Sequence, residues 1–555
     1  MDTPPEQPGR ASAGPDDGAR RADADASTAP DGARLPLGTA VLVVVLALFA
    51  ALTAGHLVAA VVGPGASPLV AVGNSVIDLA PSWLVEFGKD VFGTKNKLVL
   101  LLGIGLALVL LGVATGAASR RKAAPGVGLI AALGAVGIAA VVTRTELGQL
   151  AVAAPIVGLL VGIVVFPWLH RLARETYVDS SGNAGGADDV RTVRTGADAR
   201  LTDASRRRFI GSSLGVAAGA GVAGLTGQAF AGPDVQASRA DIAPFQPKTT
   251  APPIPKGADF AANGTPTLIT PNRDFYTIHT ALVVPRVPVD DWTLRIHGMV
   301  DRPLTLTYDE LRQRPLVERT LTLACVSNPV GGRLISTANF IGVDLRDLLQ
   351  EAGVKPGAEQ LYSTSHDGFT AGTPVDVVME PDRRAMLALG MNGEPLPVSH
   401  GFPVRMVVPG LYGFVSATKW LVDLELTTWD AKQGYWQPRG WAREAPVKTQ
   451  SRIDGPLGDI TAGDVVVAGT AWAPHVGIDA VEVRVDDGPW QRAELSTEVS
   501  VDTWRMWRAT VRMSRGENTV TCRATDRTGA TQPEVETPVA PDGATGWHSV
   551  TFTAR

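Results

Sequence analysis

The chain has 555 residues, more than a single hydrophobic core accommodates, so we expect three or four domains. Its 50 basic and 55 acidic residues give a net charge of −5, which excludes the strong positive field of a nucleic-acid-binding protein. Only 19% of the residues are charged, which indicates that part of the chain lies in lipid. The two cysteines exclude a disulfide framework and a four-cysteine zinc or iron–sulfur site.

Long uncharged runs dominate the N-terminal third of the chain. Residues 1–34 precede them and are rich in Pro, Gly, Ala and Asp, so we predict a disordered cytoplasmic tail there. The runs occupy residues 35–62, 98–119, 123–143 and 147–169. Each reaches the roughly 20 residues that a helix needs to cross the hydrocarbon core of a bilayer. They predict a four-helix membrane domain over 35–169, with the lipid bilayer as a partner.

A basic segment separates this domain from a fifth, weakly apolar run. We predict a cytoplasmic loop over 170–208, and the motif Ser-Arg-Arg-Arg-Phe-Ile at 205–210 spans the boundary between this loop and the run. The run at 209–233 follows and is rich in Gly and Ala. Paired arginines before Phe and a mild hydrophobic region resemble a twin-arginine export signal, with Ala-Phe-Ala at 229–231 as its cleavage site. The alternative is an ordinary fifth membrane span.

Lysine and arginine are unevenly distributed around the runs. Basic clusters lie at 20–34, 120–122, 170–174 and 206–208. Alternating spans place all four clusters on one side, and the positive-inside rule makes that side the cytoplasm. The sequence therefore predicts a multi-pass protein of the bacterial cell membrane, with every residue after the fifth run outside the cytoplasm.

The remaining residues differ in composition from the membrane part. The predicted parts are a linker at 234–266, an α+β domain at 267–430, a connector at 431–448 and an immunoglobulin-like β-sandwich at 449–555. In the α+β domain, short β-rich runs alternate with helical patches, of which 345–352 has Asp344 as its N-cap. In the last part, short alternating strands are separated by turn residues such as Gly488 and Gly516. The fold class is therefore multi-domain.

One cysteine stands at a position where chemistry is possible. Cys325 ends the apolar β run at 320–325 and opens a loop that contains Gly331 and Gly332. Such a cysteine is a nucleophile, a metal ligand or an inert core residue. Residue type alone favours the inert core, and the sequence does not show the neighbouring base that a catalytic thiol needs.

Several motifs in a fixed order surround this cysteine. They are NRDFY at 272–276, LTLACVSN at 321–328, GGRLISTANFIGVD at 331–344, HGFPVRMVVPG at 400–410, SATKWL at 416–421 and GWHSV at 546–550. On these motifs, residues 271–428 resemble the molybdopterin domain of the sulfite oxidase family. Residues 449–555 resemble that family's C-terminal dimerisation domain, which implies a homodimer formed through it.

The resemblance implies a molybdenum–molybdopterin cofactor and assigns its site. Cys325 matches the protein ligand of molybdenum and is the catalytic residue. A soft thiolate suits such a metal, and the metal keeps it deprotonated. The implied cofactor-binding residues are Asn272, Tyr276, Thr277, Asn328, His400, Arg405, Ser416 and Lys419. Ser416 and Lys419 are one residue further apart than in the family's Ser-x-Lys element.

At the positions where the family binds its substrate, the sequence departs from the family pattern. Sulfite oxidases carry cationic arginines at positions that here hold Ile278, Pro329 and Val330. Fewer cations weaken the capture of an anion, so we expect the physiological substrate to differ from sulfite unless Arg333 or Arg439 compensates. The candidates are small extracytoplasmic molecules, either sulfite, a sulfoxide or a similar compound.

Three hypotheses follow for the function. The leading one is a membrane-anchored molybdenum oxidoreductase that works by oxygen-atom or two-electron transfer. Because the chain has no Cys-x-x-Cys-His haem motif, we expect a separate electron-transfer partner besides the small-molecule substrate. The alternative is a tethered binding or scaffold protein whose molybdopterin domain is catalytically degraded. A transporter ranks low, because the spans lack intramembrane charges.

Overall fold

The computed structural model describes residues 34–81, 84, 87–88, 91–92, 95–144, 147–181, 198–229 and 235–555. Most of the predicted tail at 1–34, residues 182–197 of the predicted loop at 170–208 and most of the predicted cleavage site at 229–231 lie outside the described residues. The chain divides into two compact units. The first comprises Met1–Ala54, Gly105–Ala135 and Gly158–Val222, and the second comprises Gly55–Ile104, Val136–Val157 and Ala223–Arg555.

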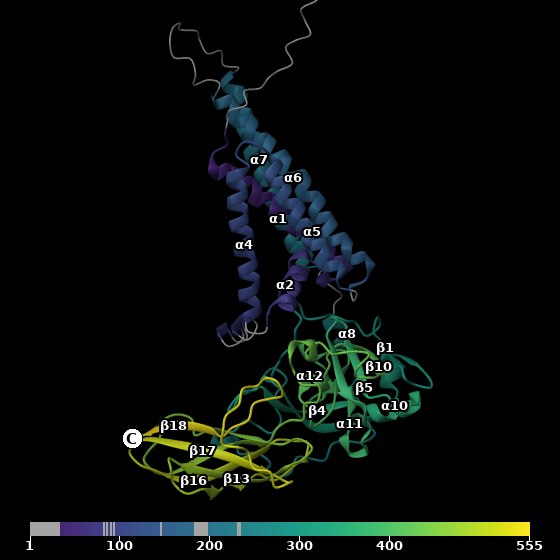
Figure 1. Ribbon diagram of the computed structural model, residues 1–555, viewed down its shortest axis with the longest axis vertical. Helices are drawn as coiled ribbons and strands as arrows, with labels where there is room; N and C mark the ends of the chain where they lie inside the picture. The colour runs from purple at the N-terminus through teal and green to yellow at the C-terminus, as the bar shows by residue number, and fades with distance from the viewer. Residues whose placement is uncertain are drawn as a thin grey trace, which may run out of the picture. The chain divides into compact units, whose positions relative to one another are not determined.

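Long helices form most of the N-terminal part (Figure 1). Their bounds are α1 (Leu37–Val62), α2 (Pro68–Leu79), α4 (Asn96–Ala118), α5 (Ala124–Val142), α6 (Ala153–Ser181) and α7 (Asp198–Ala229). Among the described residues, five helices are long and apolar enough to cross a membrane by length and composition. Four of them match the predicted runs. The fifth, α7, begins at Asp198, ahead of the predicted start of the fifth run at 209.

Small residues allow the helices of the first unit to pack closely. A Cβ atom built on Gly116 of α4 would lie 2.8 Å from Val41 Cα of α1, and one built on Gly126 of α5 would overlap the ring of Phe166 in α6. Close backbone approach through glycine is typical of helices that associate in a membrane. Phe209 of α7 belongs to the same buried cluster. The fifth helix therefore packs with the others in this unit.

Two five-stranded sheets form the region that follows α8 (Val235–Ala240). The first sheet has the order β3-β4-β7-β8, with β9 paired to β7, and all its neighbours are antiparallel. Its strands are β3 (Leu316–Ala324), β4 (Ile335–Asp344), β7 (Met386–Met391), β8 (Glu394–Pro395) and β9 (Arg405–Val407). The β-rich runs and helical patches of the sequence are thus confirmed as a mixed α and β region.

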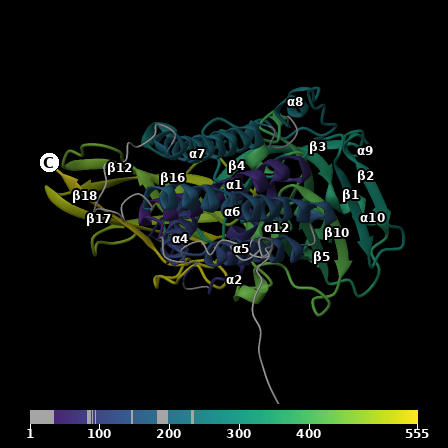
Figure 2. The same ribbon diagram turned by 90° about the horizontal axis from the view of Figure 1, so that it is seen from above.

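The second sheet has the order β2-β1-β10-β5-β6, in which β1 and β10 are parallel (Figure 2). Its strands are β1 (Thr293–Gly298), β2 (Leu304–Thr307), β5 (Gln360–Ser365), β6 (Thr370–Pro374) and β10 (Leu421–Thr427). Short helices connect the strands, and they are α9 (Tyr308–Arg312), α10 (Leu345–Ala352), α11 (Val375–Met379) and α12 (Gly413–Ser416).

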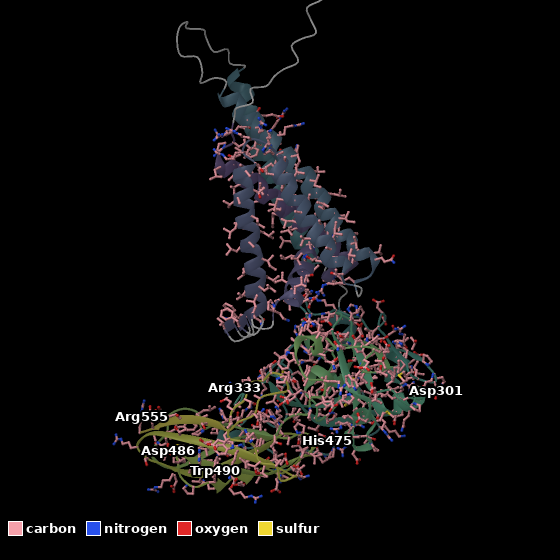
Figure 3. The ribbon with its side chains drawn as sticks, in the orientation of Figure 1. Asp301, Arg333, His475, Asp486, Trp490 and Arg555 are labelled. Carbon is pink, nitrogen blue, oxygen red and sulfur yellow. The ribbon has the colours of Figure 1, made fainter. Side chains whose placement is uncertain are left out.

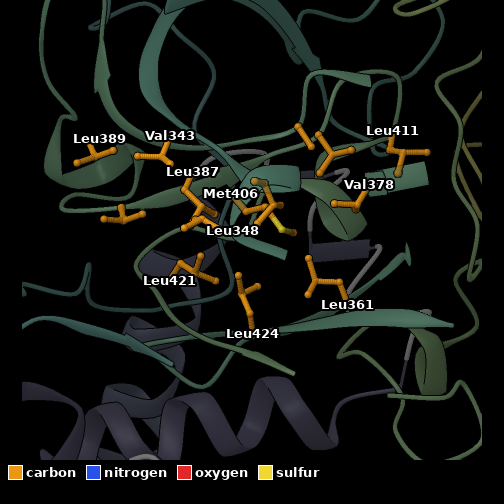
Figure 4. Packing of buried hydrophobic residues seen from close by; sticks show 14 of the residues in the cluster. Val343, Leu348, Leu361, Val378, Leu387, Leu389, Met406, Leu411, Leu421 and Leu424 are labelled. Atoms are coloured by element: carbon orange, nitrogen blue, oxygen red, sulfur yellow. The ribbon is translucent and has the colours of Figure 1, made fainter. Parts of the chain in front are cut away.

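One hydrophobic core joins the two sheets (Figure 4). Leu387 of β7 comes from the first sheet, Leu361 and Leu424 come from the second, and Leu348 comes from α10. All four are fully buried. Because burying one such side chain contributes about 1.5–3 kcal/mol, this shared core fixes how the two sheets face each other.

Helix α10 shows how local sequence sets an element. Asp344 accepts a hydrogen bond from the backbone N–H of Asp347 and caps the helix. Gly353 ends the helix with a φ of 72°, a conformation that favours glycine. The helix covers Leu345–Ala352, so the sequence prediction of both its cap and its extent is confirmed.

The segment predicted as a linker at 234–266 packs onto the folded region. Phe260 belongs to the main core, and Phe245 packs against it. The backbone N–H of Lys248 donates to the carbonyl of Leu316 in β3. Prolines between these residues remove hydrogen-bond donors, so the segment is held by isolated side-chain and backbone contacts that show no periodicity in the sequence.

The C-terminal region is β-rich, as predicted. It contains two four-stranded antiparallel sheets, β11-β12-β16-β15 and β14-β13-β17-β18, around a common core. The strands are β11 (Gln450–Gly455), β12 (Gly463–Trp472), β13 (Ile478–Val485), β14 (Gln491–Arg492), β15 (Glu494–Leu495), β16 (Arg505–Met513), β17 (Gly516–Asp526) and β18 (His548–Ala554). Cys522 lies in β17, where burial raises the pKa of its thiol to about 12. It forms no disulfide with Cys325.

Candidate active site

Cys325 lies at the start of the loop that joins β3 to β4. Strand β3 ends at Ala324, which pairs with Ile335 at the start of β4. The N–H of Cys325 donates to the carbonyl of Leu334 across the loop, at 2.9 Å. The amide oxygen of Asn328 accepts from the N–H of Leu334 at 2.8 Å. These two hydrogen bonds to Leu334 hold together the loop that carries the thiol.

The C-terminal region supports this loop from outside, within the same compact unit. Arg452 of β11 donates to the carbonyl of Gly332 at 2.7 Å and forms an ion pair with Asp454. Gly331 has a φ of 72°, and a Cβ atom there would lie 2.3 Å from the ring of His548. Gly331 is thus required by its close approach to β18 as well as by the turn, whereas a Cβ atom on Gly332 would lie 2.4 Å from Oδ1 of Asn328 in the same loop.

Tyr276 lies beside the cysteine. Its ring stacks on that of Phe275 at 5.4 Å, and its N–H donates to the hydroxyl of Ser336 in β4. Burial, followed by the negative charge of the Cys325 thiolate, raises the pKa of the phenol. Tyr276 therefore keeps its proton and can donate a hydrogen bond from Oη.

His400 is buried against the same aromatic residue. Its ring meets that of Phe275 edge to face at 5.4 Å, and Nε2 lies 3.1 Å from the carbonyl of Asn272. Burial, followed by the charges of Lys419 and Arg405, lowers the pKa of His400 to about 4. The neutral imidazole donates from Nε2 to the carbonyl, which leaves Nδ1 as an acceptor.

Arg405 is a buried cation without a carboxylate partner among the described residues. Its guanidinium donates to the carbonyls of His400 at 3.2 Å and Ala417 at 3.3 Å. It also lies over the ring of Phe340. Burial lowers the pKa of Arg405 to about 10, so the group stays charged at neutral pH. A buried cation held only by carbonyls is poorly compensated, and an anionic ligand would stabilise it.

Lys419 adds a second basic side chain to the site. Its Nζ donates to the carbonyls of Ile278 at 3.1 Å and Ser399 at 3.2 Å. Burial, followed by the charge of Arg405, lowers the pKa of Lys419 well below its ordinary value. The nearby thiolate of Cys325 opposes this shift. Lys419 thus lies within electrostatic reach of the cysteine.

Several buried polar atoms around these groups have no hydrogen-bond partner in the described part of the chain. They are Nδ2 of Asn328, Nδ1 of His400, Nε of Arg405 and Nδ1 of His279. Such atoms are costly inside a protein unless a partner satisfies them. Their grouping beside Cys325 indicates a binding site for a ligand that has several hydrogen-bonding edges and a negative charge.

Three predicted site residues use their side chains elsewhere. The amide of Asn272 bonds Met391, Asn392 and Glu394, and only its backbone carbonyl reaches His400. The hydroxyl of Ser416 donates to carbonyls one turn earlier in the chain. The hydroxyl of Thr277 lies 3.4 Å from the carbonyl of Phe275. These contacts give the three side chains structural partners.

The two arginines considered as substitutes for the missing cations are not brought into the cluster. Arg439 stacks on Tyr435 at 3.8 Å and forms an ion pair with Asp78. Arg333 is exposed in the loop after Cys325 (Figure 3).

Two groups that sequence reasoning did not assign to the site do reach it. His279 packs its ring edge to face against Trp420 at 5.6 Å. Burial, followed by the charges of Lys419 and Lys97, lowers the pKa of His279 to about 3. His279 belongs to none of the motifs, and Lys97 is 182 residues away from it in the chain, so neither residue carried a signal in the sequence.

The chain is similar to known proteins over about half of its length. Residues 281–436 match the family described as Oxidoreductase molybdopterin binding domain. The chain is 30% identical over 325 residues to mitochondrial sulfite oxidase of Rattus norvegicus, covering 50% of this chain and 59% of that one. It is 30% identical to sulfite oxidase of Gallus gallus, covering 49% and 69%.

A bacterial relative covers a shorter stretch. An uncharacterized oxidoreductase of Bacillus subtilis (strain 168) is 32% identical over 177 residues, which cover 31% of this chain and 85% of the relative. The chain spans only 59% of the length of the rat enzyme, so shared ancestry is shown for the matched part. The motifs, the site geometry and these matches agree, and the chain belongs to the sulfite oxidase family of oxidoreductases, whose cofactor is molybdenum–molybdopterin.

Proposed function

We propose that the protein is a membrane-anchored oxidoreductase that acts by oxygen-atom or two-electron transfer on a small extracytoplasmic substrate. A separate protein would exchange electrons with it. The observation that carries the proposal is the group of buried polar atoms beside Cys325 that find no partner within the described part of the chain. A catalytically degraded domain would be under no pressure to keep such costly atoms in place.

The residues present fit the cofactor. The phosphate of molybdopterin would offset the buried charge of Arg405, and Lys419 would add a point charge. The acceptor Nδ1 of His400 and the donor Nδ2 of Asn328 suit the hydrogen-bonding edges of a pterin. Cys325 would bind the metal through its sulfur.

The cofactor supplies the redox chemistry when it is bound. The residues of the chain would bind and orient the cofactor, and they would hold protons at fixed atoms. The neutral imidazole of His400 and the protonated phenol of Tyr276 keep fixed hydrogen-bond roles at neutral pH, because burial shifts both pKa values away from it. The loop that carries Cys325 is held by Arg452, so the thiol position does not depend on the hairpin alone.

The cofactor assignment is tested on the purified full-length protein. We expect molybdenum and pterin at close to one equivalent per chain, measured by mass spectrometry of the metal and fluorescence of the oxidised pterin. We also expect turnover with at least one of sulfite, a sulfoxide or an N-oxide, using an artificial electron donor or acceptor. A loaded protein that is inactive on the whole panel would favour the tethered binding protein instead.

We also propose that the apolar helices anchor the protein in the bacterial cell membrane. Basic residues flank the apolar stretches, at 120–122 after α4 and at 206–208 near the start of the apolar part of α7, which supports a cytoplasmic position for them. Residues 267–430 would then form an extracytoplasmic catalytic domain. The β-rich region at 449–555, with its two sheets around one core, would be an immunoglobulin-like dimerisation domain.

Cysteine labelling of the intact cell tests this orientation. Single cysteines introduced at the exposed positions Arg121 and Arg333 of a variant without Cys325 and Cys522 are expected to differ, with only the second reacting with a membrane-impermeant maleimide. Equal labelling of both positions without cell lysis would contradict the proposed topology.

A further inference from the structure

A lysine from an apolar helix contacts the catalytic region. Lys97 is the second residue of α4, and its Nζ donates to the carbonyls of His279 at 2.8 Å and Ala281 at 2.5 Å. Both partners belong to the same compact unit as Lys97. The side chain is partly buried by this contact. The segment 278–281 is therefore held by a residue from far away in the sequence.

Two lysines hold this segment. Lys419 donates to the carbonyl of Ile278, and Lys97 donates to that of His279, the next residue. A lysine ammonium has three donors, and each lysine uses two of them on carbonyls. One donor on each ammonium therefore stays available for a ligand oxygen, within the part of the chain that the structure describes.

Neighbouring contacts fix the position of Lys97. A Cβ atom on Gly73 of α2 would lie 2.8 Å from Leu282, the residue after Ala281, and 3.8 Å from Leu101 of α4. Helices α2 and α4 therefore meet at the same segment. Further along α2, Asp78 accepts a hydrogen bond from the hydroxyl of Tyr435 at 2.8 Å. Packing contacts and a hydrogen bond thus hold α2 and α4 against the region that Lys97 contacts.

Basic side chains gather around the segment, and burial lowers the pKa of Lys97 to about 8, so this ammonium stays mostly protonated at neutral pH. Lys97, Lys419 and Arg405 form no ion pair within 4 Å in the described residues, and all three donate to neutral carbonyls. Asp367 is the carboxylate whose charge acts on Lys97 and Lys419. The charge of the Cys325 thiolate also acts on Lys419, which donates to the residue next to the one that Lys97 holds, so the basic groups lie within electrostatic reach of the proposed metal site.

We propose that Lys97 of α4 is a specificity-determining residue that supplies a cation to the substrate site and positions the segment 278–281 for a small oxyanion. This inference rests on the proposed function, and it makes the first turn of α4 part of the substrate site. Two carbonyls already fix the position of the ammonium. Little free energy is therefore lost in ordering this group when the anion binds.

The test compares full-length enzymes that carry Lys97→Met, Lys97→Arg or Lys95→Met. Methionine keeps the length of the side chain and removes the charge. Lys95 is exposed and lies two residues before Lys97, which makes its variant the matched control. We expect Lys97→Met to raise KM for sulfite about tenfold, as the loss of one charge-assisted hydrogen bond does, with kcat changed less. Turnover of a neutral sulfoxide should fall much less than turnover of sulfite.

Two further measurements separate recognition from packing. The dependence of kcat/KM for sulfite on ionic strength should become weaker in Lys97→Met and should be restored in Lys97→Arg. Binding of sulfate, an unreactive oxyanion, should weaken about tenfold in calorimetric titration of Lys97→Met and should be unchanged in Lys95→Met. This last readout does not need activity, so it is informative even if the proposed function fails.

The outcomes are distinct. Equal loss of kcat/KM for sulfite and for the sulfoxide would overturn the proposal, because it would assign Lys97 a packing role only. Unchanged KM and unchanged sulfate binding would overturn it as well. Absence of molybdenum from the wild-type protein would contradict the proposed function, whereas sulfate binding would still decide whether Lys97 contributes to an anion site.

Discussion

Replacing Cys325 by serine is expected to abolish turnover while the fold remains intact. The hydroxyl is close in size to the thiol, and the side chain is only 8% exposed, so packing changes little. Serine is a harder ligand that stays protonated, and it cannot replace a thiolate on a soft-ligated metal. We expect kcat to fall by more than about a hundredfold, the loss seen when even an outer-shell partner of a metal is removed. The measurements are kcat, bound molybdenum and the unfolding temperature.

Cys522 provides the matched control for that experiment. It is the other cysteine of the chain, it is fully buried in β17, and it accepts a hydrogen bond from Ser451. Cys522→Ser should keep the molybdenum content and kcat of the wild type, with some loss of stability because a polar group is buried in an apolar core. If Cys325→Ser retained kcat within tenfold, the assignment of Cys325 as metal ligand would be wrong.

Arg405→Met should have opposite effects on the protein with and without its cofactor. Without cofactor, the change removes a buried cation that only carbonyls compensate, so we expect an unfolding temperature equal to or higher than that of the wild type. With cofactor, the change removes charge-assisted hydrogen bonds to the phosphate. Each is worth roughly 1.5–3 kcal/mol, so we expect retention of the pterin to weaken at least about tenfold.

Arg319→Met is the control for this second prediction. Arg319 of β3 pairs with Asp344 at 2.6 Å and donates to the carbonyl of Arg384. Its loss should destabilise the protein, because Asp344 also caps α10, and it should leave the pterin content unchanged. The two arginine variants would then differ in the sign of the stability change. A marked loss of stability in cofactor-free Arg405→Met would show that the guanidinium has a structural role.

The sequence by itself determined the features that depend on neighbouring residues. Runs of about 20 uncharged residues are sufficient to predict the long helices, because length and hydropathy are local properties. Asp344 and the apolar spacing behind it predicted α10 with its cap, because capping involves only the next three residues. The motif around Cys325 identified the family, because the residues that hold one cofactor occur in a fixed order along the chain.

The tertiary structure decided which of these residues meet. Ser416 and Asn272 match the motif, yet their side chains bond to nearby elements, and Arg439 pairs with Asp78. His279 and Lys97 carried no motif, and they lie beside Lys419. A contact across more than 180 residues, such as that of Lys97 with Ala281, depends on how helices and sheets pack, and no local pattern encodes that.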